Sequence, residues 1–217
     1  MAYIDLVATS AFGTESIVAS ELKKLGVTDT RIENGRIYFK GDYPLIVKAN
    51  LWLRCAERVM IIVGEFRAED FGELFEGTKS LRWEDIIPEN GIMHVTGKSV
   101  KSKLHSVPDC QSIVKKAVVE AMKRRYRKEK FAEDGPLFKI EISMLKDVAT
   151  LSIDTSGAGL HRRGYRVSQG EAPIKETLAS SIIHLSRWTP DRPFVDPMCG
   201  SGTFAIEAAC IGRDIAP

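Results

Sequence analysis

The most constraining feature of the sequence is the segment FVDPMCGSGTFAIEAACIG, which spans residues 194–212. An apolar pair that begins with Phe194 precedes an Asp-Pro dipeptide, a turn with two glycines and an apolar pattern typical of a helix. This order predicts a buried parallel β-strand, a tight loop and an α-helix that begins near Thr203. Gly200 and Gly202 permit positive φ angles and a close approach of a ligand to the backbone. The unpaired N–H groups of the first helical turn would point at that ligand.

The spacing of this loop argues against two common nucleotide motifs. A phosphate loop of the form GxxxxGK[ST] needs a lysine after its second glycine, but Thr203 follows Gly202 directly. A dinucleotide fingerprint places a third glycine where this chain has Ala205, a position that tolerates alanine. A phosphate ligand is therefore only weakly indicated, and a turn with glycines for packing alone is the other alternative.

The same residues resemble the first motif of S-adenosylmethionine-dependent methyltransferases, in particular those that act on exocyclic amines of bases. The resemblance implies that the loop wraps the methionine part of the cofactor, with Asp196 near its amino group. It gives S-adenosylmethionine as the cofactor and predicts seven cofactor-binding residues: Asp196, Pro197, Cys199, Gly200, Ser201, Gly202 and Thr203.

Residues 1–66 show the pattern of a small mixed domain. Strand and helix signals alternate in the order β, α, β, β, α, β, with a helix over 14–25 and a hairpin centred on Asn34-Gly35. A second helix is expected over 43–55 and a last strand over 59–66. This order is typical of a ferredoxin-like sandwich.

Residues 67–156 form a second predicted module. We expect a helix within 71–87, a strand over 92–97, a long helix over 110–130 and a hairpin that turns at Lys146-Asp147. The long helix has an apolar stripe and a basic opposite face.

Positive charge is concentrated in the middle of the chain. Residues 98–166 carry 16 basic and 8 acidic side chains, whereas the net charge of the whole chain is only +2. A solvated helix face is the ordinary explanation of such a run, but this excess is too large for balanced i,i+4 pairing. We therefore predict a nucleic-acid contact. The predicted RNA-binding residues are Lys115, Lys116, Lys123, Arg124, Arg127, Lys128, Arg162, Arg163 and Arg166.

The segments LHRRGYR (160–166) and EAPIKETLAS (171–180) carry a second resemblance. By composition alone, 157–171 is a basic interdomain connector. Its sequence resembles the connector that precedes the catalytic domain in the RNA methylase family with an N-terminal THUMP domain, and the likeness extends in order over the whole chain. The resemblance implies α+β ferredoxin-like and THUMP domains over 1–66 and 67–156, followed over 172–217 by the start of an α/β Rossmann-like methyltransferase domain.

That resemblance also implies a function. The family transfers a methyl group from S-adenosylmethionine to the exocyclic amine of a guanine, in 23S ribosomal RNA, so RNA is the expected partner. Two alternatives remain: a transfer RNA methyltransferase of the same architecture, and a non-catalytic RNA-binding module. His161 is expected to contact RNA or a neighbouring domain rather than to act as a base.

A helix is also expected over 172–185, with a buried stripe of Ile174, Leu178, Ile182 and Leu185 and with Ala179 and Ile183 beside it. In related methyltransferases such a helix closes over the cofactor, so Ala172, Pro173 and Thr177 are candidates for lining the site.

Several expected features are missing from the sequence. Only one strand of the parallel sheet is predicted, and no (N/D)PP(Y/F) tetrapeptide, which the family uses on the target amine, occurs. We therefore expect a truncated enzyme, inactive by itself, and assign no catalytic residue. The four cysteines form no CxxC pair and no histidine pairing occurs, so no metal site is predicted. The N-terminus lacks the pattern of a signal peptide and no apolar run could span a bilayer, which predicts a cytoplasmic protein without membrane contact.

Overall fold

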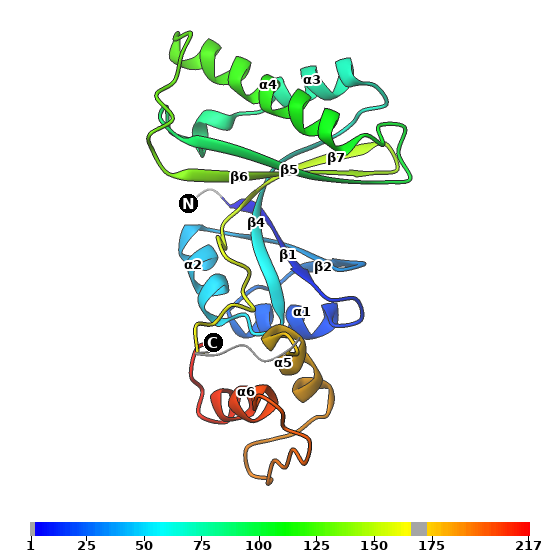
Figure 1. Ribbon diagram of the computed structural model, residues 1–217, viewed down its shortest axis with the longest axis vertical. Helices are drawn as coiled ribbons and strands as arrows, with labels where there is room; N and C mark the ends of the chain where they lie inside the picture. The colour runs from blue at the N-terminus through cyan, green and yellow to red at the C-terminus, as the bar shows by residue number, and fades with distance from the viewer. Residues whose placement is uncertain (1–2, 166–172) are drawn as a thin grey trace. The chain divides into compact units, whose positions relative to one another are not determined.

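The computed structural model describes residues 3–165 and 173–217, so Arg166 and Ala172 lie outside the described residues. It contains two compact units, the first formed by Met1–Met60 with Thr155–Pro217 and the second by Ile61–Asp154 (Figure 1). In the described ranges, no helix combines the length and the apolar character needed to cross a bilayer.

The first unit begins with the predicted order of strands and helices. Its six elements are, in chain order, β1 Ile4–Ser10, α1 Glu15–Lys24, β2 Thr30–Glu33, β3 Arg36–Gly41, α2 Tyr43–Trp52 and β4 Ala56–Arg67. The hydrogen-bonded strands follow the spatial order β2-β3-β1-β4. Strand β1 pairs antiparallel to β3, and β3 antiparallel to β2. The predicted ferredoxin-like pattern is therefore confirmed. Strand β4 continues into the second unit.

Local chemistry explains these elements. Gly35, in the two-residue β2–β3 turn, has a φ of +71°, which favours glycine. The carboxylate of Asp42 accepts a hydrogen bond from the Leu45 backbone N–H (2.9 Å) and so caps α2. Alternate residues of the strands and one side of each helix form a buried core, which includes Leu6, Val18, Leu22, Ile37, Phe39, Ala49 and Val59.

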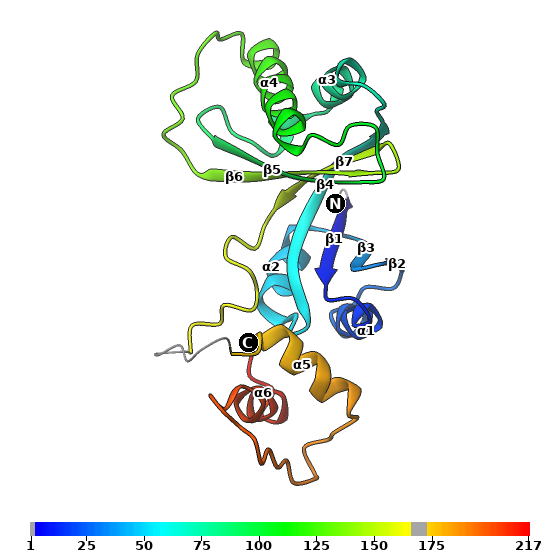
Figure 2. The same ribbon diagram turned by 45° about the vertical axis from the view of Figure 1, so that its right-hand side comes forward.

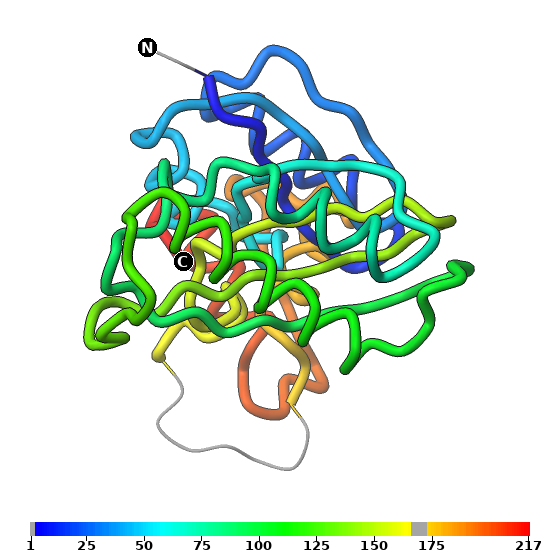
Figure 3. Tube along the Cα trace, turned by 90° about the horizontal axis from the view of Figure 1, so that it is seen from above, coloured from blue at the N-terminus to red at the C-terminus, as the bar shows by residue number. Residues whose placement is uncertain are grey.

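The second unit is a sheet covered on one face by two helices. Its strands follow the order β4-β7-β6-β5, in which β5 and β6 are parallel and β6 and β7 antiparallel. Helices α3 and α4 lie side by side over this sheet (Figures 2 and 3). The elements are α3 Phe71–Ser80, a 3₁₀ turn Trp83–Asp85, β5 Ile92–Val100, α4 Val107–Tyr126, β6 Leu137–Leu145 and β7 Val148–Asp154.

Helix α4 differs from the helix predicted over 110–130. It begins three residues earlier, with Pro108 in its first turn, and ends at Tyr126 because Arg127 adopts a left-handed φ of +53°. Its buried stripe, which includes Val114, Val118 and Met122, packs against the sheet. The residues after Tyr126 are exposed and charged up to position 130, so no apolar side chain holds them on the core.

The last two helices are α5 Glu176–Leu185 and α6 Thr203–Gly212, which lie side by side (Figure 2). The strand predicted at Phe194 is not formed, and the neighbouring Val195 is 80% exposed. A parallel strand exists only beside a partner strand, and the described residues place none next to this segment.

The helix predicted over 172–185 begins only at Glu176, so Ile174 precedes it. Its predicted stripe was also wrong. Leu178, Ile182 and Leu185 are exposed. The buried residues are Ala179 and Ile183, which were expected beside the stripe, and four polar ones: Glu176, Thr177, Ser180 and Ser181.

Candidate functional site

The predicted cofactor loop is an open turn that leads directly into α6. Gly200 and Gly202 have φ angles of +51° and +74°, and an added Cβ at either position would meet no atom within 4 Å. The positive φ, rather than crowding, therefore explains the glycines. The Gly202 N–H donates to the Cys199 carbonyl (2.8 Å), and the Gly202 carbonyl accepts from the Ile206 N–H (2.9 Å). This turn directs the first N–H groups of α6 toward the loop.

Asp196 supplies the acidic group of this loop. Its Oδ1 accepts a hydrogen bond from the Met198 backbone N–H (3.1 Å). Its Oδ2 is buried without a hydrogen-bond partner in the described structure, which is unfavourable for a carboxylate oxygen. The residues thus fit a ligand that offers an ammonium group to Asp196 and an acceptor to the amides of α6.

The other loop residues divide into exposed and buried ones. Pro197 and Cys199 are exposed, as is Ser201. Thr203 is 2% exposed, and its hydroxyl lies 3.1 Å from that of Ser201. The buried Thr203 side chain therefore contacts the loop through this pair of hydroxyl groups.

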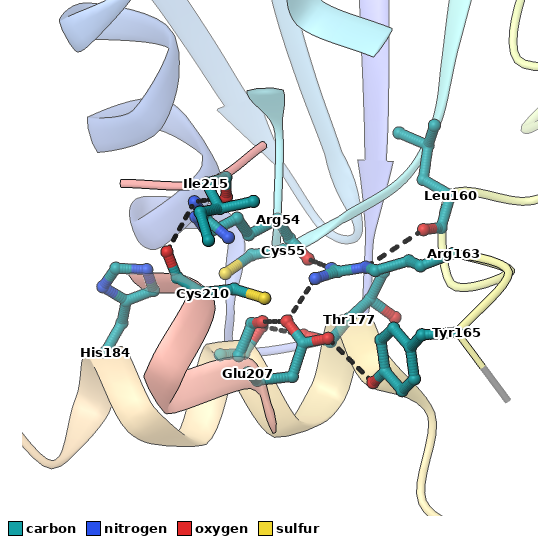
Figure 4. Close-up of polar contacts among 12 residues, drawn as sticks. Arg54, Cys55, Leu160, Arg163, Tyr165, Thr177, His184, Glu207, Cys210 and Ile215 are labelled. Atoms are coloured by element: carbon teal, nitrogen blue, oxygen red, sulfur yellow. Dashed lines mark hydrogen bonds and ion pairs between the residues drawn. The ribbon is translucent and has the colours of Figure 1, made fainter. Parts of the chain in front are cut away.

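A buried polar network joins α6 to the segment around Arg163 and Tyr165 (Figure 4). At its centre is Glu207 of α6, which is fully buried. Glu207 forms an ion pair with Arg163 and accepts hydrogen bonds from Tyr165 Oη (2.9 Å) and Ser180 Oγ (2.5 Å). The Arg163 side chain is only 3% exposed, which excludes it from a surface contact with nucleic acid. Its predicted RNA-binding role was wrong, because a carboxylate 44 positions later in the sequence holds it inside the unit.

A second polar cluster involves Glu21, Cys55 and His184, whose donor atoms lie within 4.8 Å of one another. These are ligand types that zinc accepts. Burial, however, raises the pKa values of Glu21 and Cys55 and lowers that of His184, so the proton-bearing thiol is favoured. The Arg54 guanidinium lies close to both Glu21 and His184 and would repel a dication. We read the cluster as a polar contact between helices and strand; the predicted absence of metal stays a prediction.

The basic α4 surface comprises the six predicted residues on and just after this helix: Lys115, Lys116, Lys123, Arg124, Arg127 and Lys128. Three of them are engaged within the second unit. Lys123 lies 3.3 Å from Glu120 and 3.4 Å from Glu129, and Lys128 pairs with Glu89. Lys116 Nζ lies 5.8 Å from the centre of the Phe75 ring.

The other three residues of this surface, Lys115, Arg124 and Arg127, are exposed. Within the described ranges, none of them forms an ion pair. Arg124 and Arg127 also line a hollow at the ends of α3 and α4. The hollow is formed by Ser80, Leu81, Arg82, Glu84, Ala121, Arg124, Arg125 and Arg127. Arg82, which pairs with Asp85 (3.0 Å), reaches this hollow from some 40 positions earlier, and no local sequence pattern indicates that proximity.

The remaining candidates lie on or near the connector. Arg162 is exposed, with its side chain free of ion pairs in the described part of the chain. His161 lies 3.7 Å from Glu57, which also accepts a hydrogen bond from the hydroxyl of Thr177 (3.0 Å). Thr177 is buried, and its hydroxyl is engaged in this contact. Pro173 is half-buried and precedes α5.

Comparison with known families accounts for the chain in three consecutive parts. Residues 5–60 match the RlmL ferredoxin-like domain, residues 68–154 the THUMP domain, and residues 163–217 the RMKL-like methyltransferase domain. A Bacillus subtilis (strain 168) protein named "Putative RNA methyltransferase YpsC" is 56% identical over 214 residues, which is 98% of this chain and 55% of the relative. The chain therefore carries RlmL ferredoxin-like, THUMP and RMKL-like methyltransferase domain matches in this order, and it is similar to a relative named as a putative RNA methyltransferase.

Solved structures of similar chains agree with these domain matches. A protein from Listeria monocytogenes str. 4b F2365, described as a predicted N6-adenine-specific DNA methylase, is 58% identical with a TM-score of 0.96; the likeness covers 100% of this chain and 57% of that one. SMU.472, described as a putative methyltransferase complexed with SAH, is 52% identical with a TM-score of 0.94, over 100% of this chain and 58% of that one. The chain thus spans a little over half the length of these relatives. The expected α+β architecture with ferredoxin-like, THUMP and methyltransferase parts is confirmed.

Proposed function

We propose that this chain is part of an RNA methyltransferase that transfers a methyl group from S-adenosylmethionine to the exocyclic amine of a guanine in 23S ribosomal RNA. One observation carries the proposal: the Cys199–Gly202 turn, with two glycines at positive φ at the start of α6, in a chain 52% identical to a methyltransferase crystallised with SAH. The Listeria relative is named for a different base and a different nucleic acid, but N6 of adenine is also an exocyclic amine.

The loop residues supply binding and orientation in this proposal. Bound S-adenosylmethionine carries a methyl group on a sulfonium, which is the electrophile. The unpartnered Oδ2 of Asp196 would accept a hydrogen bond from the ammonium of the methionine part, and the N–H groups at the start of α6 would bind its carboxylate. Pro197, Cys199, Gly200, Ser201, Gly202 and Thr203 shape the turn. An aromatic amine is a weak nucleophile, so holding it in line with the methyl group is the main contribution of the protein.

RNA is held, in this proposal, by the unpaired members of the basic α4 surface and by Arg162. Lys115, Arg124 and Arg127 are exposed cations that no carboxylate of the described residues neutralises, so they are free to contact phosphates. The match to a THUMP domain over 68–154 and the name of the Bacillus relative support RNA rather than DNA. The target base would have to leave its stack to reach the methyl group. Arg166, the predicted domain boundaries and a cytoplasmic location stay predictions.

The experiment that tests this function is methyl transfer from radiolabelled S-adenosylmethionine. A chain of the relatives' full length is offered 23S ribosomal RNA, transfer RNA or DNA, each taken from a strain without the gene, and the labelled nucleoside is identified by mass spectrometry. We expect label on the N2 atom of a guanine in 23S RNA, and none with the 217-residue chain, which has no (N/D)PP(Y/F) tetrapeptide. Label in transfer RNA would select the alternative substrate, and label in DNA alone would refute the proposal.

A further inference from the structure

The network around Glu207 ties the connector to the helix that carries the cofactor loop. Arg163 and Tyr165 belong to the connector, Ser180 to α5 and Glu207 to α6 (Figure 4). Glu207 lies five residues after Gly202, in the second turn of α6. It is thus close enough to the loop for a change in its position to move the loop.

Both oxygens of the Glu207 carboxylate are engaged. Oε2 faces Arg163 and accepts from Ser180, while Oε1 accepts from the hydroxyl of Tyr165. A carboxylate with no exposed surface needs such partners, because transfer of an unpaired charge out of water is strongly unfavourable. The position of Glu207 is therefore determined by these three donors.

Arg163 is fixed in turn by the backbone of its own unit. One terminal nitrogen, Nη2, donates to the Arg54 carbonyl, Nε donates to the Leu160 carbonyl (3.4 Å), and Nη1 faces Glu207. The planar guanidinium thus uses all three nitrogens in fixed directions. The Arg54 carbonyl lies just before β4, so the ferredoxin-like strands provide the reference point for Arg163.

Polar contacts hold helix α6 at both ends. Its fully buried residues are Thr203, Glu207 and Ala208, of which only Ala208 is apolar, and Phe204 and Ile211 are partly buried. At its other end, the Arg54 guanidinium donates to the Cys210 carbonyl (3.4 Å) and to the Ile215 carbonyl just beyond the helix. Directional polar contacts therefore act together with packing on α5 to set how α6 presents its first turn.

We propose that Arg163 and Tyr165 are positioning residues for the cofactor loop, and that they act through Glu207. This inference rests on the proposed function, since it assumes that the loop binds S-adenosylmethionine. It separates two neighbouring arginines by role: the exposed Arg162 contacts RNA, and the buried Arg163 orients the loop.

The test compares Arg163→Met with Arg162→Met, a matched control that removes the same charge one position away. In the 217-residue chain, amide NMR signals of Gly200 and Gly202 report the loop without any ligand. In a chain of the relatives' full length, SAH and RNA affinities are measured separately. We expect Arg163→Met to shift both glycine signals and to weaken SAH binding by about tenfold or more, as for a lost hydrogen bond to a charged group. RNA affinity of Arg163→Met should stay within about twofold of the parent. Arg162→Met should weaken RNA binding but leave the glycine signals and the SAH affinity unchanged.

Two further variants guard against a loss of folding. Tyr165→Phe removes one hydrogen bond, whereas Glu207→Gln removes the charge and replaces one acceptor oxygen by an NH2 donor. Both should shift the glycine signals in the same direction as Arg163→Met, with a smaller effect for Tyr165→Phe. Unchanged glycine signals in folded Tyr165→Phe and Glu207→Gln would overturn the inference, as would an equal loss of SAH and RNA affinity in Arg163→Met. If the parent protein binds no SAH, the proposed function fails, while the glycine signals still decide whether Glu207 positions the loop.

Discussion

Removal of the unpaired cations of the basic α4 surface should flatten the salt dependence of RNA binding. The perturbation is Lys115→Gln, Arg124→Gln and Arg127→Gln in one chain. Each of these side chains is exposed and free of an ion pair in the described part of the chain, so each can replace a counterion at a phosphate. The paired Lys123 and Lys128 are left in place.

The expected magnitude follows from the number of contacts. Each phosphate neutralised contributes about 0.7 to 0.9 to the slope of log K against log salt, so three lost contacts reduce the slope by about 2 to 3. If parent and variant bind equally at about 1 M salt, a slope lower by about 2 makes the variant roughly 50-fold weaker at about 0.15 M salt. Substitutions at exposed positions should leave stability nearly unchanged, within about 0.5 kcal/mol.

The assay is fluorescence anisotropy with a labelled RNA hairpin between about 0.05 and 0.4 M KCl. A control of equal charge, Lys98→Gln with Lys101→Gln and Lys146→Gln, removes three cations from the same unit, of which Lys98 pairs with Glu141 (2.8 Å). A Cβ added at Gly97 would meet Val107 and Gln111 of α4. Because side chains alternate along a strand, Lys98 points to the opposite face of the sheet. Equal slope changes in the two triple variants would show that net charge alone drives binding. An unchanged slope in the first would remove α4 from the interface.

Three further predictions concern stability and reactivity. Trp83→Ala should destabilise the second unit by about 3 to 5 kcal/mol in urea unfolding, because this fully buried side chain leaves a cavity; a change below about 1 kcal/mol would contradict the packing described. Burial lowers the pKa of His184 and so keeps the imidazole neutral in the folded protein, which makes stability fall as the pH drops below about 6.5. His184→Gln should remove that decrease. Comparison of the variant with the parent corrects for Glu21, whose raised pKa makes stability rise as the pH drops. Cys199 is exposed and should react with a thiol reagent in the native protein, with protection by SAH, whereas buried Cys55 should react only on unfolding; mass spectrometry of the labelled peptides distinguishes them.

Features that depend on a few neighbouring residues could be predicted from the sequence. The Asn34-Gly35 and Lys146-Asp147 turns are where the pattern placed them, with positive φ at Gly35 and at both residues of the second turn. The buried stripe of α4 also follows from its periodicity, because the spacing of apolar residues determines which side of a helix can be buried.

Features that depend on distant parts of the chain could not be predicted from the sequence. The apolar residues at Phe194 indicate a strand, yet a strand forms only beside a partner, and local sequence does not contain that information. Periodicity likewise showed that α5 has an apolar stripe with Leu178 and Ile182, but it could not show that the small and polar side would be the one buried.

Arg163 shows the same limit for charge. Three arginines between glycines are normally solvated, and sequence gives no measure of how far a guanidinium lies from a carboxylate 44 positions away. Only the fold brings Glu207 to it, and the pairing changes its expected role from RNA contact to internal support.

The physical demands of the proposed reaction explain why such support is useful. An open turn around glycines binds a ligand through backbone groups, and these can be directed only by the helix that follows them. Apolar packing resists separation of a helix from its neighbours but fixes its rotation poorly, whereas a carboxylate held by three donors fixes both. Methyl transfer depends on alignment, and a displacement of about 1 Å can reduce a rate by about 10²-fold. A buried ion pair that adds little net stability can therefore still be important at this position, because it determines the direction in which the loop faces.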